Sequence, residues 1–228
     1  MERSTWNVAQ PPNSLMPFPL PSVSRADFSA ALAACSPEPL EARTVDAFYA
    51  HYQELSLWNQ RLSLIGPGTA GEIMERHYGE ALAALPLVPR EARHGLDLGS
   101  GAGFPGLVLA AARPTLAMTL AEARERKWAF LAAAARRASL PCRCLNVRVG
   151  IPLPAGLPES LDVVTARALK LDREVLSALA ARLGTDGRIL LWVGEDDPDL
   201  PPELSPSGSI KLPGSRTRRI LQLQRSPD

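Results

Sequence analysis

A glycine-rich turn between two apolar stretches is the feature that most constrains how this chain folds. The segment Gly95–Leu107 has the sequence GLDLGSGAGFPGL, and apolar residues continue to Ala112. Glycines let a backbone turn sharply and let a ligand approach the main-chain amides, since no Cβ is in the way. The first amides of the helix that follows are unpaired donors. The pattern therefore predicts a strand, a tight turn and a helix that together form a nucleotide-type pocket.

The chain alternates between strand-like and helix-like segments around and after this turn. The strand candidates are Gly95–Leu98, Met118–Ala121, Arg143–Val147, Leu161–Thr165 and Ile189–Val193. The helix candidates are Phe104–Ala112, Glu125–Ala138 and Asp172–Leu183, with Gly184 at the cap position of the last. Such alternation predicts an α/β fold with a mostly parallel sheet that is covered by helices on both faces. Ser209–Leu212 and Arg219–Gln224 flank a Pro-Gly turn and predict an antiparallel hairpin at the sheet's edge.

Three regions divide the chain by composition and periodicity. Residues 1–24 are rich in proline and predict a disordered tail. Residues 25–90 carry apolar side chains at three- and four-residue spacings, which predicts an N-terminal helical cap. Within this cap we expect one helix from Thr69 to Leu85. Residues 91–228 form the α/β domain.

Bulk properties exclude several classes of protein. The net charge of +1 gives no bulk sign of nucleic-acid binding, so any basic surface must be local. The pair Cys142 and Cys144 neither builds a disulfide framework nor completes a four-ligand metal site, and a reducing cytoplasm is the simpler interpretation. No apolar run approaches the ~18 residues of a membrane span, and the start of the chain has no secretory pattern. We therefore expect a cytoplasmic protein with no membrane or metal partner.

The glycine turn is compatible with two kinds of nucleotide ligand. Gly101-x-Gly103-x-x-Gly106 satisfies the dinucleotide fingerprint. However, a carboxylate at Asp97 would crowd a pyrophosphate, and Pro105 removes an amide that a pyrophosphate uses. Glu122 ends the second strand, where an acid binds the ribose hydroxyls of NAD or of S-adenosylmethionine. The set favours S-adenosylmethionine, which carries a sulfonium and an ammonium and no phosphate. A non-enzymatic dinucleotide-binding domain remains an alternative, as does a turn-capping role for Asp97.

Several segments resemble one known family. Residues 95–109 are similar to the cofactor motif of class I S-adenosylmethionine-dependent methyltransferases. The form DLGSGAGFPG resembles the small-subunit ribosomal RNA guanine-N7 methyltransferase family, also called methyltransferase G or the glucose-inhibited division protein B family. Further matches follow the family's order from about residue 45 to residue 225: Tyr52, Leu55, Trp58-Asn59, Ser63-Leu64-Ile65, His77, Glu122-Ala123, Lys127, Phe130-Leu131 and Val164-Thr165-Ala166-Arg167-Ala168.

The resemblance implies a fold, a cofactor and site residues. The fold is a class I methyltransferase (Rossmann-like) sheet over residues 91–228, with a terminal antiparallel hairpin and the N-terminal helical cap. In the family, residues matching Gly99 and Phe104 contact S-adenosylmethionine, and those matching Val149 and Gly150 lie near its adenine. Arg167 matches the family's motif arginine after the fourth strand. The expected cofactor-binding residues are Asp97, Gly99, Gly101, Gly103, Phe104, Glu122, Val149, Gly150 and Arg167.

The implied reaction transfers a methyl group to N7 of a guanine in 16S ribosomal RNA. Guanine N7 has an in-plane lone pair and no proton, so alignment suffices and no general base is needed. The Asn-Pro-Pro-Tyr motif typical of amine methyltransferases is replaced here by Ala166-Arg167-Ala168. A bidentate arginine would block N7. We therefore expect Arg167, the catalytic candidate, to contact O6 alone, a phosphate or the cofactor's surroundings. A salt bridge from Arg167 to Asp162 or Asp172 is the structural alternative.

The expected partner is small-subunit ribosomal RNA or a ribosomal particle. Basic side chains contact RNA phosphates, and the candidates are Lys127, Arg216, Arg218 and Arg219. Three places depart from the family's pattern: Gly79-Glu80-Ala81 stands for x-Asp-Ser, Gly150 for an acid, and Val193-Gly194 for Lys-Gly. These departures keep open a methyltransferase of the same fold that acts on another RNA or on a small molecule.

Overall fold

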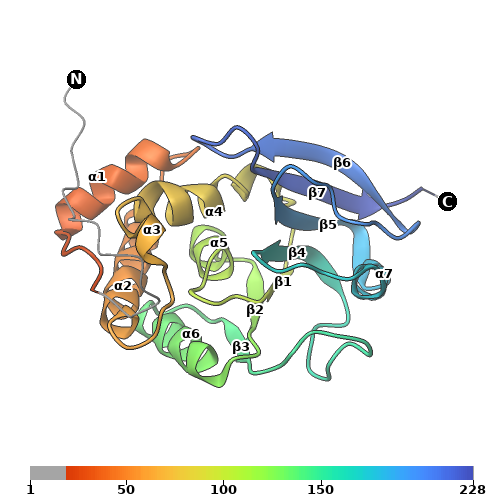
Figure 1. The fold of residues 1–228 in the computed structure, drawn as a ribbon, viewed down its shortest axis with the longest axis horizontal. Helices are drawn as coiled ribbons and strands as arrows, with labels where there is room; N and C mark the ends of the chain where they lie inside the picture. Colours follow the sequence, from red (N-terminus) through yellow and green to blue (C-terminus); the bar gives the residue numbers. More distant parts are fainter. Residues whose placement is uncertain (1–18, 228) are drawn as a thin grey trace.

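A seven-stranded sheet with the order β3-β2-β1-β4-β5-β7-β6 organises the chain in the computed structural model, which describes residues 19–227 (Figure 1). The first five strands pair in parallel, and β7 runs antiparallel between β5 and β6. The α/β class and the terminal hairpin predicted from the sequence are confirmed. The strands are β1 (His94–Leu98), β2 (Ala117–Ala121), β3 (Arg143–Leu145), β4 (Leu161–Arg167), β5 (Leu183–Val193), β6 (Leu204–Lys211) and β7 (Arg219–Arg225).

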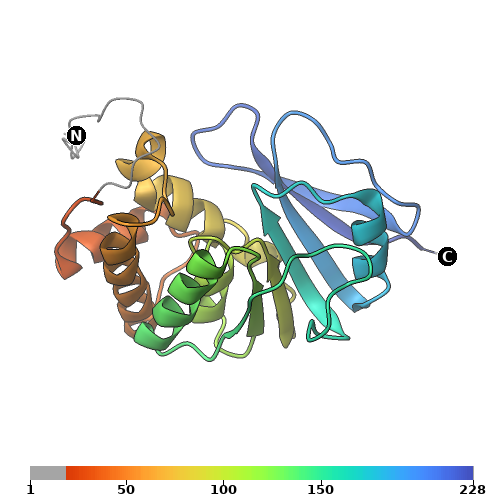
Figure 2. The ribbon, with the colours of Figure 1, turned by 60° about the horizontal axis from the view of Figure 1, so that its bottom comes forward.

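Helices cover both faces of the sheet, as its apolar strands require. Successive side chains of a strand point to opposite faces, so on β4 Val163 joins one core cluster and Val164 the other. The first cluster also holds residues of α5 (Gly106–Ala112) and α6 (Glu125–Arg137), and the second those of α7 (Arg173–Ala180). Figure 2 shows α7 on the opposite side of the sheet from α5 and α6. Burial on both faces is what a parallel sheet needs.

The N-terminal cap is helical but more broken than its sequence predicts. The expected helix from Thr69 to Leu85 is wrong. The helix is interrupted at residues 71–72, where Gly71, a poor helix former, caps the first piece, and residues 74–79 then form a π-helical turn. The cap's elements are α1 (Arg25–Cys35), α2 (Ala42–Asn59), α3 (Pro67–Ala70), the π-helix η1 (Met74–Gly79), α4 (Glu80–Leu82) and the 3-10 helix η2 (Leu85–Leu87).

Part of the segment predicted as a disordered tail is ordered. Residues 1–18 lie outside the described part of the chain, but residues 19–24 pack on the cap. Leu20 is buried in the first core cluster. The hydroxyl of Tyr52 donates to the Pro21 carbonyl, and that of Tyr49 to the Val23 carbonyl at 3.0 Å. The disorder predicted for residues 19–24 is therefore corrected, because Leu20 is buried in the core and two backbone carbonyls accept hydrogen bonds from α2.

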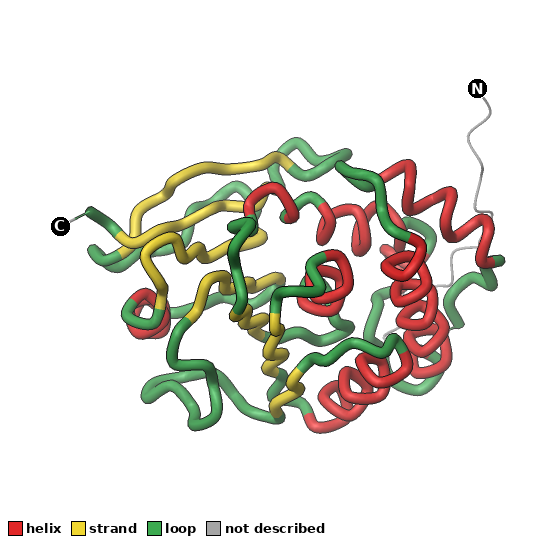
Figure 3. The backbone as a smooth tube through the Cα atoms, turned by 180° about the vertical axis from the view of Figure 1, so that it is seen from behind, coloured by secondary structure: helices red, strands yellow, loops and turns green. Residues whose placement is uncertain are grey.

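Two further boundaries differ from the sequence prediction. Gly184 does not cap α7: the helix ends at Ala180 with Ala181 as its C-cap, and Gly184 lies inside β5. The strand β3 is shorter than expected, and the chain runs from it to β4 through loops and turns rather than a helix (Figure 3). These loops bring residues 146–151 to the carboxyl ends of the strands.

The glycine turn combines left-handed backbone with one very close helix approach. Gly99, Gly101 and Gly103 have φ values of +68°, +54° and +87°, a region that side chains other than glycine rarely adopt. Gly106 has a different role, at the start of α5. A Cβ there would lie 2.4 Å from Leu120 Cδ2 and 2.6 Å from Asp97 Oδ2. The missing side chain therefore lets α5 pack directly on β1 and β2.

We expect Gly106→Ala to lower the free energy of unfolding by about 1–3 kcal/mol, the usual cost of overpacking a close-packed core. The matched control is Gly68→Ala in α3, where an added Cβ meets no atom within 4 Å. Urea unfolding followed by circular dichroism measures both variants. Equal stabilities of the two variants would show that α5 does not depend on this close approach.

Candidate active site

A cavity of about 750 Å³ opens at the carboxyl ends of the parallel strands. It lies where the strand order reverses between β1 and β4, which is the usual ligand position in an open α/β sheet. Each strand contributes the segment that follows it. The lining includes Gly99–Ala102, Phe104, Ala121–Arg124, Lys127, Val147–Ile151, Arg167–Asp172, Glu174 and, from the cap, Leu64, Ile65 and His77.

Most of the predicted cofactor residues meet in this cavity. The residues that line it are Gly99, Gly101, Phe104, Glu122, Val149, Gly150 and Arg167, together with the RNA candidate Lys127. Asp97 and Gly103 were expected among the cofactor contacts, but neither lines the cavity. The arginines Arg216, Arg218 and Arg219 lie at or before the start of β7 and do not line it either.

Asp97 lies behind the glycine turn and holds it in place. Its Oδ1 accepts a hydrogen bond from Thr165 Oγ1 at 2.7 Å, and its Oδ2 one from the Gly106 amide at 3.3 Å. Complete burial raises the pKa of Asp97 to about 6, against these hydrogen bonds, which lower it. This is the turn-capping role that the sequence left open.

The amides of the glycine turn are already bonded within the protein. Gly101 N–H donates to Glu122 Oε2 at 3.0 Å, and Gly103 N–H donates to the Ser100 carbonyl at 2.7 Å. The amides of Gly99 and Ser100 both donate to the Ala121 carbonyl. A pyrophosphate site needs such amides to point at the ligand. The geometry therefore argues against the dinucleotide alternative.

Glu122 is placed to bind a ribose. Its carboxylate is nearly buried at the cavity wall, where Oε1 accepts from the Arg124 amide at 2.8 Å and Oε2 from the Gly101 amide. These two bonds fix the orientation of the carboxylate. A carboxylate accepts about four hydrogen bonds, so each oxygen keeps a lone pair for a ligand hydroxyl.

The cap supports the turn through a buried histidine that the sequence analysis did not single out. His51 Nε2 donates to the Ala102 carbonyl at 2.9 Å, and its Nδ1 lies 2.8 Å from the Tyr78 hydroxyl. Phe104 packs on the rings of His51, His77 and Tyr78, with centroids 4.9–5.2 Å apart. Burial lowers the pKa of His51 to about 4. The apolar stripe in the sequence predicts which face of α2 points inward. It does not predict that His51 on that face contacts the glycine turn.

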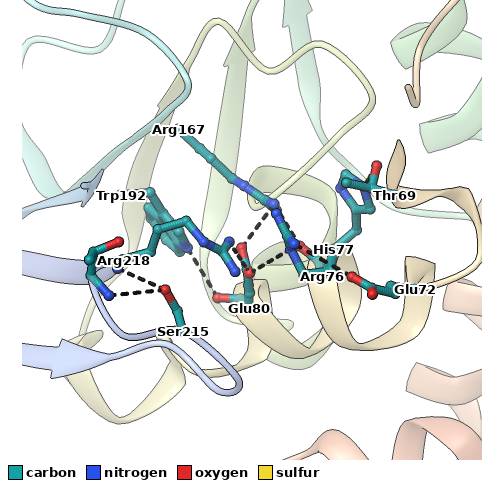
Figure 4. A network of polar contacts seen from close by, with 10 residues as sticks. Thr69, Glu72, Arg76, His77, Glu80, Arg167, Trp192, Ser215 and Arg218 are labelled. Carbon is teal, nitrogen blue, oxygen red and sulfur yellow. Dashed lines mark hydrogen bonds and ion pairs between the residues drawn. The ribbon is translucent and has the colours of Figure 1, made fainter. Parts of the chain in front are cut away.

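A buried carboxylate from the cap holds three arginines beside the cavity (Figure 4). Glu80 is 1% exposed. Its Oε1 lies 3.3 Å from Arg76 Nε and pairs with Arg218 Nη1, while its Oε2 lies 3.0 Å from Arg167 Nη2. Trp192 Nε1 donates to the Glu80 carbonyl at 3.2 Å. In the sequence, Glu80 stands where the family has an Asp, and an acid in an otherwise apolar segment is the signal that could point to its role.

Arg167 is paired with a different acid from the two that the sequence suggested. Its partner is Glu80 rather than Asp162 or Asp172, and Asp162 instead accepts the amides of Arg93 and His94. The Arg167 side chain is 16% exposed, and burial lowers its pKa. Its Nη2 also donates to the Arg76 carbonyl at 2.6 Å. Its Nη1 has no hydrogen-bond partner among the described residues, so this guanidinium retains a donor beside the cavity.

The hairpin arginines are largely used within the fold. Arg218 pairs with Glu80, and Arg219 pairs with Asp197 at 2.5 Å and donates to the Gly194 carbonyl. The Arg219 contacts arise because the segment after β5 lies beside the start of β7, whereas the partner of Arg218 comes from the cap. Arg216 is exposed. Of the three arginines expected to bind RNA, two therefore have acidic partners in the structure.

Comparison with known proteins identifies the family. The model of the family described as rRNA small subunit methyltransferase G matches residues 44–200. This chain belongs to that family. A Ribosomal RNA small subunit methyltransferase G from Methylobacterium radiotolerans is 38% identical over 176 residues, which are 76% of this chain and 81% of the relative. The relative of the same name from Methylorubrum populi is 40% identical over 129 residues, or 55% of this chain and 60% of the relative.

Solved structures confirm the class I methyltransferase fold. A SAM-dependent methyltransferase from Aquifex aeolicus superposes with a TM-score of 0.52 at 14% identity, over 67% of this chain and 92% of that protein. The cofactor of this methyltransferase family is S-adenosylmethionine, as the sequence predicted. Among residues 19–227, no cluster of three or more His, Cys, Asp and Glu side chains is arranged to hold a metal ion. Within the same range, no helix has both the length and the apolar character to cross a bilayer.

We expect Glu80→Gln to lower the free energy of unfolding by about 3–5 kcal/mol, because three guanidinium groups would lose their shared buried counter-charge. The matched control is Glu72→Gln, since Glu72 is an exposed partner of the same Arg76 at 3.4 Å. This control should lose less than about 1 kcal/mol. Denaturant unfolding of both variants measures the difference, and equal losses would contradict the central role of Glu80.

We also expect His51 to make the stability depend on pH. An unfolded histidine has a pKa of 6.5 and His51 in the fold about 4, so the unfolded chain binds more protons between these values. Stability is therefore lost as the pH falls from 6.5 toward 4. Relative to His51→Gln, the wild type should lose about 2 kcal/mol between about pH 7 and pH 5. Urea unfolding at both pH values measures this, and the exposed His94→Gln should behave like the wild type.

Proposed function

We propose that this protein transfers a methyl group from S-adenosylmethionine to N7 of a guanine in small-subunit ribosomal RNA. One observation carries the proposal within this family: the same cavity is lined by the ribose-type carboxylate of Glu122 and by Arg167, which has a donor to spare. A volume of about 750 Å³ lies in the upper part of the 300–1,000 Å³ range of ligand pockets. This size supports binding of a nucleoside cofactor together with a base.

The cavity's residues fit S-adenosylmethionine. Glu122 would hold the ribose hydroxyls, Gly99 and Gly101 would lie along the ligand, and Val149 and Gly150 would lie near the adenine. The carboxylates of Asp172 and Glu174 also line the cavity, which suits a ligand that carries an ammonium and a sulfonium. When bound, the cofactor supplies an electrophilic methyl group.

The chain's own residues position the base and need not remove a proton from it. Guanine N7 attacks through a lone pair, so orientation and proximity supply most of the rate. Arg167 Nη1 would donate to guanine O6 alone, which leaves N7 open to the methyl group. His77 lines the cavity as a neutral imidazole, because burial and nearby arginines lower its pKa to about 3, and its Nε2 lies 3.0 Å from Thr69 Oγ1.

The substrate and its setting follow from the same proposal. The target guanine has to leave its stack or lie in an open loop to enter the cavity. The RNA would be met in the cytoplasm, either free or in a small-subunit particle. We assign Lys127, at the cavity wall, to the RNA side of the site.

The decisive experiment uses ribosomal RNA from a strain that lacks this gene. The purified protein with S-adenosylmethionine should restore N7-methylguanine, measured by mass spectrometry of the digested nucleosides. Glu122→Ala should weaken S-adenosylhomocysteine binding by about 1–3 kcal/mol, or roughly tenfold to a hundredfold, as two amides and the ribose lose an acceptor.

Calorimetry measures that binding, and Glu125→Ala is the matched control. Glu125 is an exposed acid in the first turn of α6 and does not line the cavity, so its variant should bind like the wild type. Methylation of another RNA, with no N7-methylguanine in the small subunit, would replace the proposed substrate. Absence of S-adenosylhomocysteine binding to the wild type would overturn the proposal.

A further inference from the structure

A second hollow of about 450 Å³ lies beside the cavity, between the end of α2 and the start of α6. It is lined by residues 61–63 and 124–127. Arg124 and Lys127 line both this hollow and the cavity. We call the hollow and its cations Arg61, Arg124, Arg126 and Lys127 the basic groove.

The charges of the basic groove are not balanced by the protein. Four cations face one carboxylate, that of Glu125. Among the described residues, none of the four cations has a carboxylate oxygen within 4.0 Å, whereas Arg218 and Arg219 each have one. Unpaired cations that gather in one concave place favour a polyanionic ligand.

The two walls of the basic groove are joined by a hydrogen bond. Arg126 Nη2 donates to the Arg61 carbonyl at 3.3 Å, which ties the start of α6 to the end of α2. Arg61, Arg124 and Arg126 are exposed, and Lys127 is half-buried. Burial and the nearby Arg124 lower the pKa of Lys127, and the Glu122 carboxylate acts against this shift. The groove is therefore formed before any ligand binds.

We propose that the basic groove binds the phosphate backbone of the substrate RNA next to the target guanine. This inference rests on the proposed function. It specifies, in addition, from which side the RNA reaches the cavity. A strand whose guanine enters the cavity carries its neighbouring phosphates across the cavity rim, and Arg124 and Lys127 are the part of the rim that continues into the groove. The hairpin is the less suitable side, because Glu80 and Asp197 already pair with Arg218 and Arg219.

The test uses Arg61→Gln with Arg126→Gln, since neither residue lines the cavity. The matched control is Arg90→Gln with Arg225→Gln, which removes two exposed charges that line neither the cavity nor the basic groove. Binding to small-subunit ribosomal RNA that lacks the methyl group is measured by fluorescence anisotropy from about 50 to about 200 mM salt. Calorimetry with S-adenosylhomocysteine should give the same affinity for all three proteins.

The groove variant should bind RNA roughly tenfold to a hundredfold more weakly near 0.1 M salt. The slope of log affinity against log salt should fall in magnitude by about 2, or about 1 for each lost phosphate contact. The control should keep the wild-type affinity and slope. Wild-type RNA affinity in the groove variant, an equal loss in the control, or no RNA binding by the wild type would overturn the inference. A wild type that binds RNA through the groove but makes no N7-methylguanine would overturn the proposed function alone.

Discussion

The buried carboxylate of Glu80 is the interaction on which the site's arrangement depends. It joins the cap, the end of β4 and the turn before β7 through Arg76, Arg167 and Arg218. Glu80 and the exposed Glu72, which also pairs with Arg76, bring two negative charges to three guanidinium groups, so the cluster keeps an excess of positive charge in a partly buried place. That excess, with a spare donor on Arg167, attracts an electronegative ligand atom.

The glycine turn is held from two sides, and this determines what it can bind. Asp97 supports it from the sheet, and His51 from the cap. Several amides of the turn donate hydrogen bonds to the Ala121 carbonyl and the Glu122 carboxylate. A ligand therefore meets the concave backbone of the turn and the Glu122 carboxylate rather than a row of free N–H donors. A ribose with positively charged substituents fits that chemistry better than a pyrophosphate does.

The two flanks of the cavity differ in how their charge is balanced. On the hairpin flank, acids of the fold pair with Arg218 and Arg219. On the α6 flank, the cations of the basic groove have no such partners in the described chain. The net charge of the chain is only +1. The protein can still present a local phosphate-binding surface, because the cations on one flank are paired with acids and those on the other flank are not.

The sequence by itself determined the strand–turn–helix order, the parallel sheet and the position of Glu122, because periodicity and glycine turns are local and the carboxyl ends of parallel strands meet at one edge. Only the tertiary structure decided which charges pair. Glu80 lies 87 residues from Arg167 and 138 from Arg218, and no local pattern encodes such contacts.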